Sequence, residues 1–153
     1  MSVGIAWEET DFAIVEAAIN SVAAQTVRDA VGTGFVSPFE ANELPGPETL
    51  FTPTGDPANP RLFVRWGVEY EYVETTLDGD VSDRGGRVEL QVFGEYGTAQ
   101  VSLGRVAKFY VDALLAAADE ETMGLYAPTP PRSLPITSGF VGRSYGVEFK
   151  ATG

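Results

Sequence analysis

The feature that most limits the possible folds is a run of strictly alternating residues over positions 61–74. Its apolar members occupy every second position, which is the period of a β-strand with one buried face. These residues are Leu62, Val64, Trp66, Val68, Tyr70 and Tyr72. A second alternating run covers positions 87–93, and the polar, glycine-rich segment 75–86 separates the two runs. The pattern predicts a long β-hairpin that has its tip at 75–86 and one face in the core.

Two other segments show the three- and four-residue apolar spacing of amphipathic helices. The first covers residues 10–30, and Gly32 follows it as a helix stop. The second covers residues 98–118. We expect two further strands, at 125–127 and 140–150, with a proline-rich turn between them.

Residues 35–60 contain prolines at short intervals, so we predict a long loop there, with a short edge strand at 39–44 as the alternative. The order of elements predicts an α+β fold in a single domain that covers residues 1–153. In this fold an antiparallel β-sheet has strands of mixed length, two α-helices pack on one face of the sheet, and the long β-hairpin extends from it. With 44% hydrophobic residues the chain can form a substantial core.

The composition removes most catalytic chemistry. The chain has no cysteine and no histidine, which excludes thiol nucleophiles, disulfides, Cys–His zinc sites and histidine acid–base catalysis. It has 10 Lys and Arg against 22 Asp and Glu, and the net charge of −12 opposes attraction to DNA or to an anionic membrane. No apolar run is long enough to span a membrane, and the start has no features of a secretory signal. We therefore expect a protein without cofactors or enzymatic activity, made in the cytoplasm of its producer.

The acidic segment 78–83 is the sharpest candidate for a metal site. Asp78, Asp80 and Asp83 resemble the spaced oxygen ligands of a calcium loop, and Glu89 lies where such a loop has its last ligand. However, Asp83 stands where the sharp turn of that loop needs glycine, and Glu89 belongs to a predicted strand. We therefore favour a solvated hairpin tip over a metal site.

Aromatic and glycine patterns also have two interpretations each. Trp66, Tyr70 and Tyr72 could form a stacking platform, but their even spacing places them on the core face of the hairpin. Gly94 and Gly97 lie between a predicted strand and a helix, where backbone amides can hold a phosphate. The segment lacks the Lys and Ser/Thr of a P-loop, so we interpret these glycines as turn residues.

The opposite face of the hairpin carries carboxylates. Glu69, Glu71 and Glu89 are expected to neighbour one another across the two strands, with Arg65 and Arg87 as their partners. A glycosidase-like pair of carboxylates would also need a cleft, and no predicted element forms one.

The chain resembles the tail-terminator proteins of long-tailed bacteriophages and of phage-derived gene transfer agents. The resemblance covers nearly the whole chain and rests on the order and spacing of motifs. These are the helix end at 27–31, Pro45-Gly46-Pro47, Leu62-Phe63-Val64-Arg65-Trp66, the tip at 77–86, Gly86-Arg87-Val88-Glu89-Leu90-Gln91-Val92-Phe93, the turn and helix from Gly94 to Gly97 onward, and the ending 140–149 with Tyr145.

This resemblance implies a structural protein of the virion or phage-like particle, located at the head–tail junction. Six copies would form a ring on the head-proximal end of the tail tube, stop tube polymerisation and provide the surface on which the head docks. The implied partners are other copies of the chain, the tail tube protein and a head-completion or connector protein. DNA would pass through the ring without specific binding.

We expect the hairpin tip and the long loop to make the contacts of such a ring. The candidate interface residues are Asp78, Asp80, Asp83, Arg84, Arg87, Pro45, Pro47 and Phe51. Two alternatives stay open: a connector ring subunit of the same junction, and a small-molecule- or metal-binding module that uses the acidic hairpin.

Overall fold

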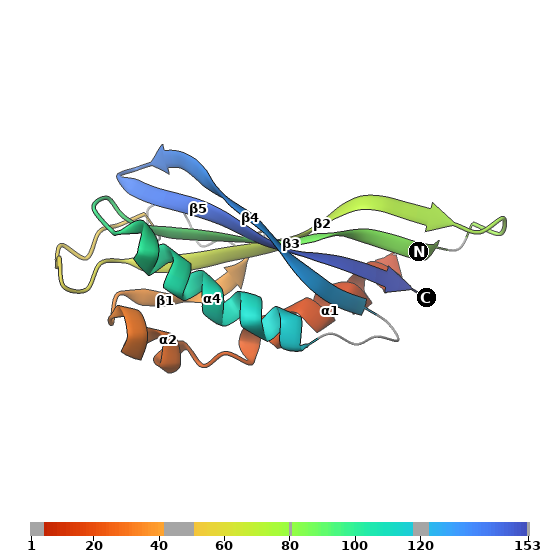
Figure 1. Cartoon of the computed structure of the whole chain (residues 1–153), viewed down its shortest axis with the longest axis horizontal. Helices are drawn as coiled ribbons and strands as arrows, with labels where there is room; N and C mark the ends of the chain where they lie inside the picture. Colours follow the sequence, from red (N-terminus) through yellow and green to blue (C-terminus); the bar gives the residue numbers. More distant parts are fainter. Residues whose placement is uncertain (1–4, 42–50, 80, 118–122, 153) are drawn as a thin grey trace.

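The structure is a computed structural model, and it describes residues 5–41, 51–79, 81–117 and 123–152. Their secondary structure is three helices and five strands in one α+β arrangement (Figure 1). In chain order these are α1 (Ile5–Asn20), α2 (Ala24–Val31), β1 (Phe35–Glu40), β2 (Leu62–Thr75), β3 (Val81–Glu95), α4 (Gln100–Ala116), β4 (Met123–Thr137) and β5 (Phe140–Thr152).

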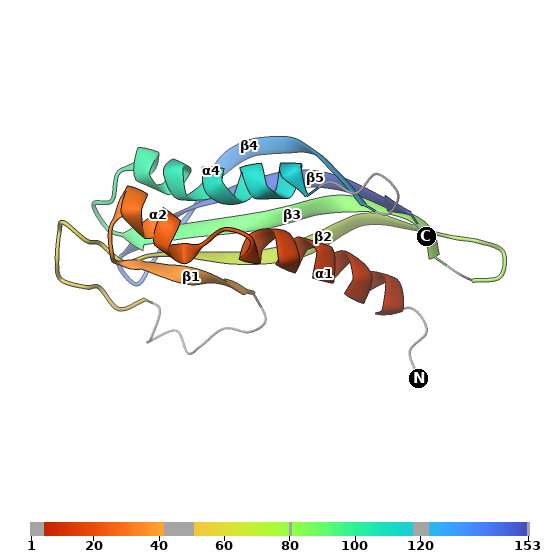
Figure 2. The ribbon, with the colours of Figure 1, turned by 90° about the horizontal axis from the view of Figure 1, so that it is seen from below.

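The five strands form one twisted sheet in the order β1-β2-β3-β5-β4. All neighbouring pairs are antiparallel except β1 and β2, which run parallel. The three helices lie together on one side of this sheet (Figures 1 and 2). The predicted α+β class is confirmed, but the expectation of a purely antiparallel sheet with two helices is wrong, because β1 joins in parallel and the first helix is divided.

The predicted helix over 10–30 is two helices. The chain leaves α1 after Asn20, and the Ser21 hydroxyl donates a 2.6 Å hydrogen bond to the carbonyl oxygen of Ala18. Serine and asparagine compete with the helical backbone for hydrogen bonds in this way, which favours helix ends over interiors. The break lets α2 change direction, and Val27 of α2 is fully buried in the core.

Two proline-containing segments form strands where turns or loops were predicted. Within the predicted loop 35–60, β1 pairs with β2, and its register shifts between Val36 and Phe39, around Pro38. In the predicted proline turn, β4 continues for 15 residues along β5 with three register shifts. Both strands are at sheet edges, where a proline removes no hydrogen bond from the interior of the sheet. The alternative strand at 39–44 lies partly outside the described residues.

The predicted hairpin is confirmed, although its tip is shorter than expected. Residues 81–86, assigned to the tip from sequence, belong to β3 and pair with β2 and β5. The helix predicted at 98–118 and the strand predicted at 140–150 correspond to α4 and β5.

The core lies between the helices and the inner face of the sheet. Its buried members come from all three described helices and all five strands, and Phe35 of β1 stacks on Tyr110 of α4. The buried residues of this cluster are Val15, Ala18, Ile19, Val27, Phe35, Leu62, Val64, Trp66, Val88, Leu90, Val92, Leu103, Val106, Ala107, Tyr110, Leu114, Met123, Leu125, Val147, Phe149 and Ala151.

The alternation predicts that Tyr72 shares the core face with Leu62 and Trp66. In the structure Tyr72 lies on the opposite face of the sheet. The register of β2 against β3 shifts between Tyr70 and Tyr72, and such a bulge moves the following side chains to the other face of the sheet. Tyr72 is 40% exposed and lies over Gly85 of β3, where a side chain would collide with its ring.

Gly86 at this bulge provides a test of the backbone packing. A Cβ at Gly86 would overlap the carbonyl oxygen of Glu69, a backbone atom that no side-chain rotation can move away. We expect Gly86→Ala to lower the free energy of unfolding by about 1–3 kcal/mol in urea denaturation. Gly124→Ala is the matched control, because its added Cβ comes no closer than 3.9 Å to the carbonyl oxygen of Lys150. Equal stability of the two variants would contradict the packing described.

Candidate interaction surface

A buried ion pair joins α1 to the β2–β3 hairpin. The Arg84 side chain is 2% exposed and the Asp11 side chain is not exposed at all. Arg84 donates from Nε to Asp11 Oδ2 at 2.5 Å and from Nη2 to Asp11 Oδ1 at 2.7 Å. This two-bond geometry is the strong form of an Arg–carboxylate pair, and it raises the pKa of the guanidinium further.

Two aromatic side chains complete this contact. The Tyr70 hydroxyl donates to Asp11 Oδ2 at 2.9 Å, and the Arg84 guanidinium lies over the Trp7 ring at 5.2 Å. Trp7 meets Tyr70 edge to face, with ring centroids 5.1 Å apart. Burial, and then the hydrogen bond to Asp11, raise the pKa of Tyr70 well above its usual value. We call Trp7, Asp11, Tyr70 and Arg84 the α1 anchor.

The hairpin extends beyond α1 as a projecting arm, which we define as the end of β2, the turn at 76–79 and the start of β3 (Figure 2). Asp78 lies in the turn at its end and Asp83 lies on β3, and both of these interface candidates are exposed. Leu77, also in the turn, has a fully exposed side chain. Asp80 lies outside the described residues.

Among the tip candidates that the structure describes, Arg84 lies where an interface residue is not expected. It was expected to pair with the tail tube or a neighbouring subunit, but it belongs to the buried part of β3 and its partner is Asp11 of the same chain. Its side chain points to the helix side of the sheet, where Asp11 requires a cation. The sequence alone does not indicate this pair, because 73 residues separate Asp11 from Arg84.

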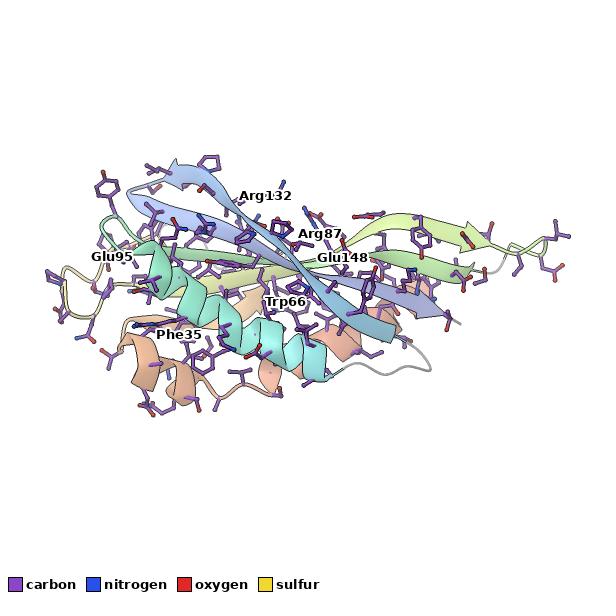
Figure 3. All side chains as sticks on the ribbon, viewed as in Figure 1. Phe35, Trp66, Arg87, Glu95, Arg132 and Glu148 are labelled. Atoms are coloured by element: carbon purple, nitrogen blue, oxygen red, sulfur yellow. The ribbon has the colours of Figure 1, made fainter. Side chains whose placement is uncertain are left out.

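The outer face of the sheet, opposite the helices, carries a polar network across four strands. Arg87 Nε lies 3.1 Å from Glu69 Oε2, and Arg87 Nη2 lies 3.9 Å from Glu89 Oε1. Glu89 also accepts a 2.7 Å hydrogen bond from the Ser144 hydroxyl and one of 3.5 Å from Arg132. Figure 3 shows Arg87 and Arg132 on the side of the strands away from Phe35, which points toward the helices.

The two carboxylates of this outer-face network differ in acidity. The hydrogen bond to Glu89, together with burial, raises the pKa of Glu69. Burial opposes the ionisation of Glu89, but hydrogen bonds from Ser144 and Glu69 and the charge of Arg87 outweigh it and lower the pKa of Glu89. The expected pairing of Glu69 and Glu89 with Arg87 is confirmed.

The other two residues predicted for this face, Arg65 and Glu71, lie outside this network. Arg65 Nε donates to Gln91 Oε1 at 2.7 Å, and its guanidinium lies 5.3 Å from the centre of the Phe93 ring. Glu71 is exposed at the bulge of β2.

The described end of the long loop, from residue 51, is fastened to the outer face of the same chain. Phe51 packs edge to face on Phe63, Phe93 and Phe140, with centroid distances of 5.3, 5.6 and 5.4 Å. Glu95 Oε1 accepts hydrogen bonds from the Thr54 amide, at 2.6 Å, and the Arg61 amide, at 2.7 Å. This places the interface candidate Phe51 in a small second core.

Pro45 and Pro47, the other two interface candidates of the loop, lie outside the described residues. Among the residues that the structure does describe, no group of three or more acidic side chains is placed to hold a metal ion. No helix in the described ranges is long and apolar enough to cross a membrane.

No family model matches this chain, and no curated protein matches it in sequence. Among solved structures, it is similar to a chain of a structure described as "Virion of native gene transfer agent (GTA) particle". The two share 15% identity, with a TM-score of 0.53, over 90% of each chain. The likeness shows that the fold is shared along nearly the whole length.

The α1 anchor predicts a large cost for removing one charge. Asp11→Asn leaves the Arg84 guanidinium buried without its counter-ion, so we expect the free energy of unfolding to fall by about 3–5 kcal/mol. Asp112→Asn is the control, since it removes the exposed pair with Lys108, which is worth at most about 0.5 kcal/mol. Urea denaturation of both variants at neutral pH measures the difference. A loss in Asp11→Asn as small as in the control would show that the anchor is dispensable.

The outer-face network predicts a pH effect. Because the pKa of Glu89 is lower in the folded chain than its usual value, its contribution to stability is present above the unfolded pKa. That contribution is lost as the pH falls through the folded pKa. Ser144→Ala removes a hydrogen bond to the ionised carboxylate, so we expect the pKa of Glu89 to rise toward its unfolded value and its contribution to stability at neutral pH to become smaller. Carboxyl-carbon NMR titration measures this, with Glu95 as the unchanged reference.

Proposed function

We propose that this chain is a structural subunit of a phage-like particle, and specifically a tail-terminator subunit. In this role, copies of the chain form a ring on the head-proximal end of the tail tube. The ring stops tube polymerisation and provides the surface on which a head-completion or connector protein docks. The observation that carries the proposal is the fold shared over 90% of the chain with a chain of a gene transfer agent virion.

The arrangement of the molecule supports a role in assembly. A single sheet backed by helices gives a rigid body, and the arm projects from it, where a neighbouring molecule could contact it (Figure 2). The anchor holds α1 and the arm in a fixed relation, which a ring of identical contacts requires.

The charge supports the same role. Six copies at −12 each give a ring a formal charge of −72, and an acidic channel allows DNA to pass without adhering. We propose that the exposed carboxylates of the arm, Asp78 and Asp83, contribute to this field.

Deletion of the gene in the producing strain tests the proposal, because the terminator and the connector fail differently. We expect overlong or irregular tubes and unattached heads in negative-stain electron microscopy, since nothing then stops tube growth. The wild-type gene supplied in trans should restore tail length. Tails of normal length beside separate heads would assign the chain to the connector ring instead. Normal, transfer-competent particles would contradict both roles.

A further inference from the structure

The parallel pairing of β1 with β2 ends halfway along β2. The last backbone bond of this ladder runs from the Ala41 amide to the carbonyl oxygen of Trp66, at 2.8 Å. β2 continues to Thr75, and among the described strands this second half pairs only with β3. Backbone groups of every second residue point to the same edge, so the amides and carbonyls of Val68 and Tyr70 point away from β3. No backbone bond to them is found among the described residues, within which they form an open edge in line with β1.

A cavity of about 400 Å³ lies along this open edge. It begins where β1 ends and follows β2 toward the arm. Its walls come from α1 on the inner side and from the outer-face network on the other. The lining includes Glu8, Phe12, Ala41, Val68, Glu69 and Glu89.

The two sides of the cavity differ in chemistry. Phe12 and Val68 present apolar surface on the helix side of the sheet. Glu69 and Glu89 present carboxylates on the outer side, and Glu8 is exposed at the rim. Arg65 also borders the cavity, but its guanidinium is already bonded to Gln91 and stacked on an aromatic ring. A strand placed here would have alternate side chains in apolar and in acidic surroundings.

The opposite edge of the sheet is closed to strand addition. It is formed by β4, whose prolines have no amide hydrogen to donate and whose register shifts three times. These prolines are Pro128, Pro130, Pro131 and Pro135. Within the described sheet, the second half of β2 is therefore better suited to receive a strand than the β4 edge.

We propose that this open edge of β2 binds an extended segment of another protein as an added strand, with Lys or Arg on its outward-facing positions and apolar residues on the alternate ones. The backbone of Val68 and Tyr70 supplies hydrogen bonds, and the acidic side of the cavity selects the basic side chains. The net charge of −12 adds long-range attraction for a basic partner.

A second copy of this chain fits the edge less well. It carries the same net charge, and its own β4 edge cannot donate a complete ladder of backbone bonds. The proposal is independent of the ring, because it concerns one chain and one partner segment. A normal result in the gene deletion would leave it standing.

Hydrogen exchange on the purified chain, followed by NMR, provides the first test. In the free chain we expect the amides of Val68 and Tyr70 to exchange fast, while that of Leu90, in the central strand β3, exchanges slowly. A short synthetic peptide of alternating Lys and Val is the probe. Its addition should slow exchange at Val68 and Tyr70. Protection of these two amides in the free chain, whether by its own residues or by self-association, would overturn the proposal.

Peptide and protein variants separate strand addition from simple charge attraction. Backbone N-methylation of the peptide on the pairing side should weaken binding by at least about tenfold in fluorescence anisotropy, because the backbone bonds are lost. Glu8→Lys should weaken binding more than Glu9→Lys, since both reverse one charge on α1 but only Glu8 lines the cavity. Equal binding of the N-methylated peptide, equal effects of the two variants, or no binding would each reject the added strand.

Discussion

The buried pair of Asp11 and Arg84 is the contact on which the arrangement of this molecule depends. Removing two charges from water is costly, and only the paired geometry with Tyr70 and Trp7 offsets that cost. The contact therefore has one well-defined arrangement, whereas apolar packing tolerates several. It fixes α1 against the base of the hairpin, and with α1 it fixes both the wall of the edge cavity and the direction of the arm.

The local parts of the fold were predictable from the sequence, and the long-range parts were not. The alternation of Leu62, Val64 and Trp66 predicts a strand with these side chains in the core, and the structure confirms their burial there. The exposure of Tyr72 depends on a bulge in β2, which moves the following side chains to the other face of the sheet. The sequence continues to alternate through this point and so does not indicate the bulge. The prolines of β4 predicted a turn, because proline is excluded from strands inside a sheet. The sequence does not reveal that this strand lies at an edge, where proline is tolerated.

The candidate surfaces divide in the same way. Cross-strand neighbours such as Glu69 and Arg87 follow from the register of one hairpin, so their pairing was predictable. The position of Arg84 was not, because the helix that buries it comes from the other end of the chain. The proposed role in a particle is supported by a resemblance and a shared fold, since no residue pattern in the described chain carries a chemical signature of its own.

The unequal edges of the sheet have a consequence for the behaviour of the chain at high concentration. Growth of cross-β fibrils requires each molecule to receive a strand on one edge and to offer another edge to the next molecule. With prolines along β4, that edge of the described sheet is poorly suited to offer a strand to the next copy. The second half of β2 can thus bind a partner strand, while the prolines of β4 disfavour amyloid-like polymerisation through that edge.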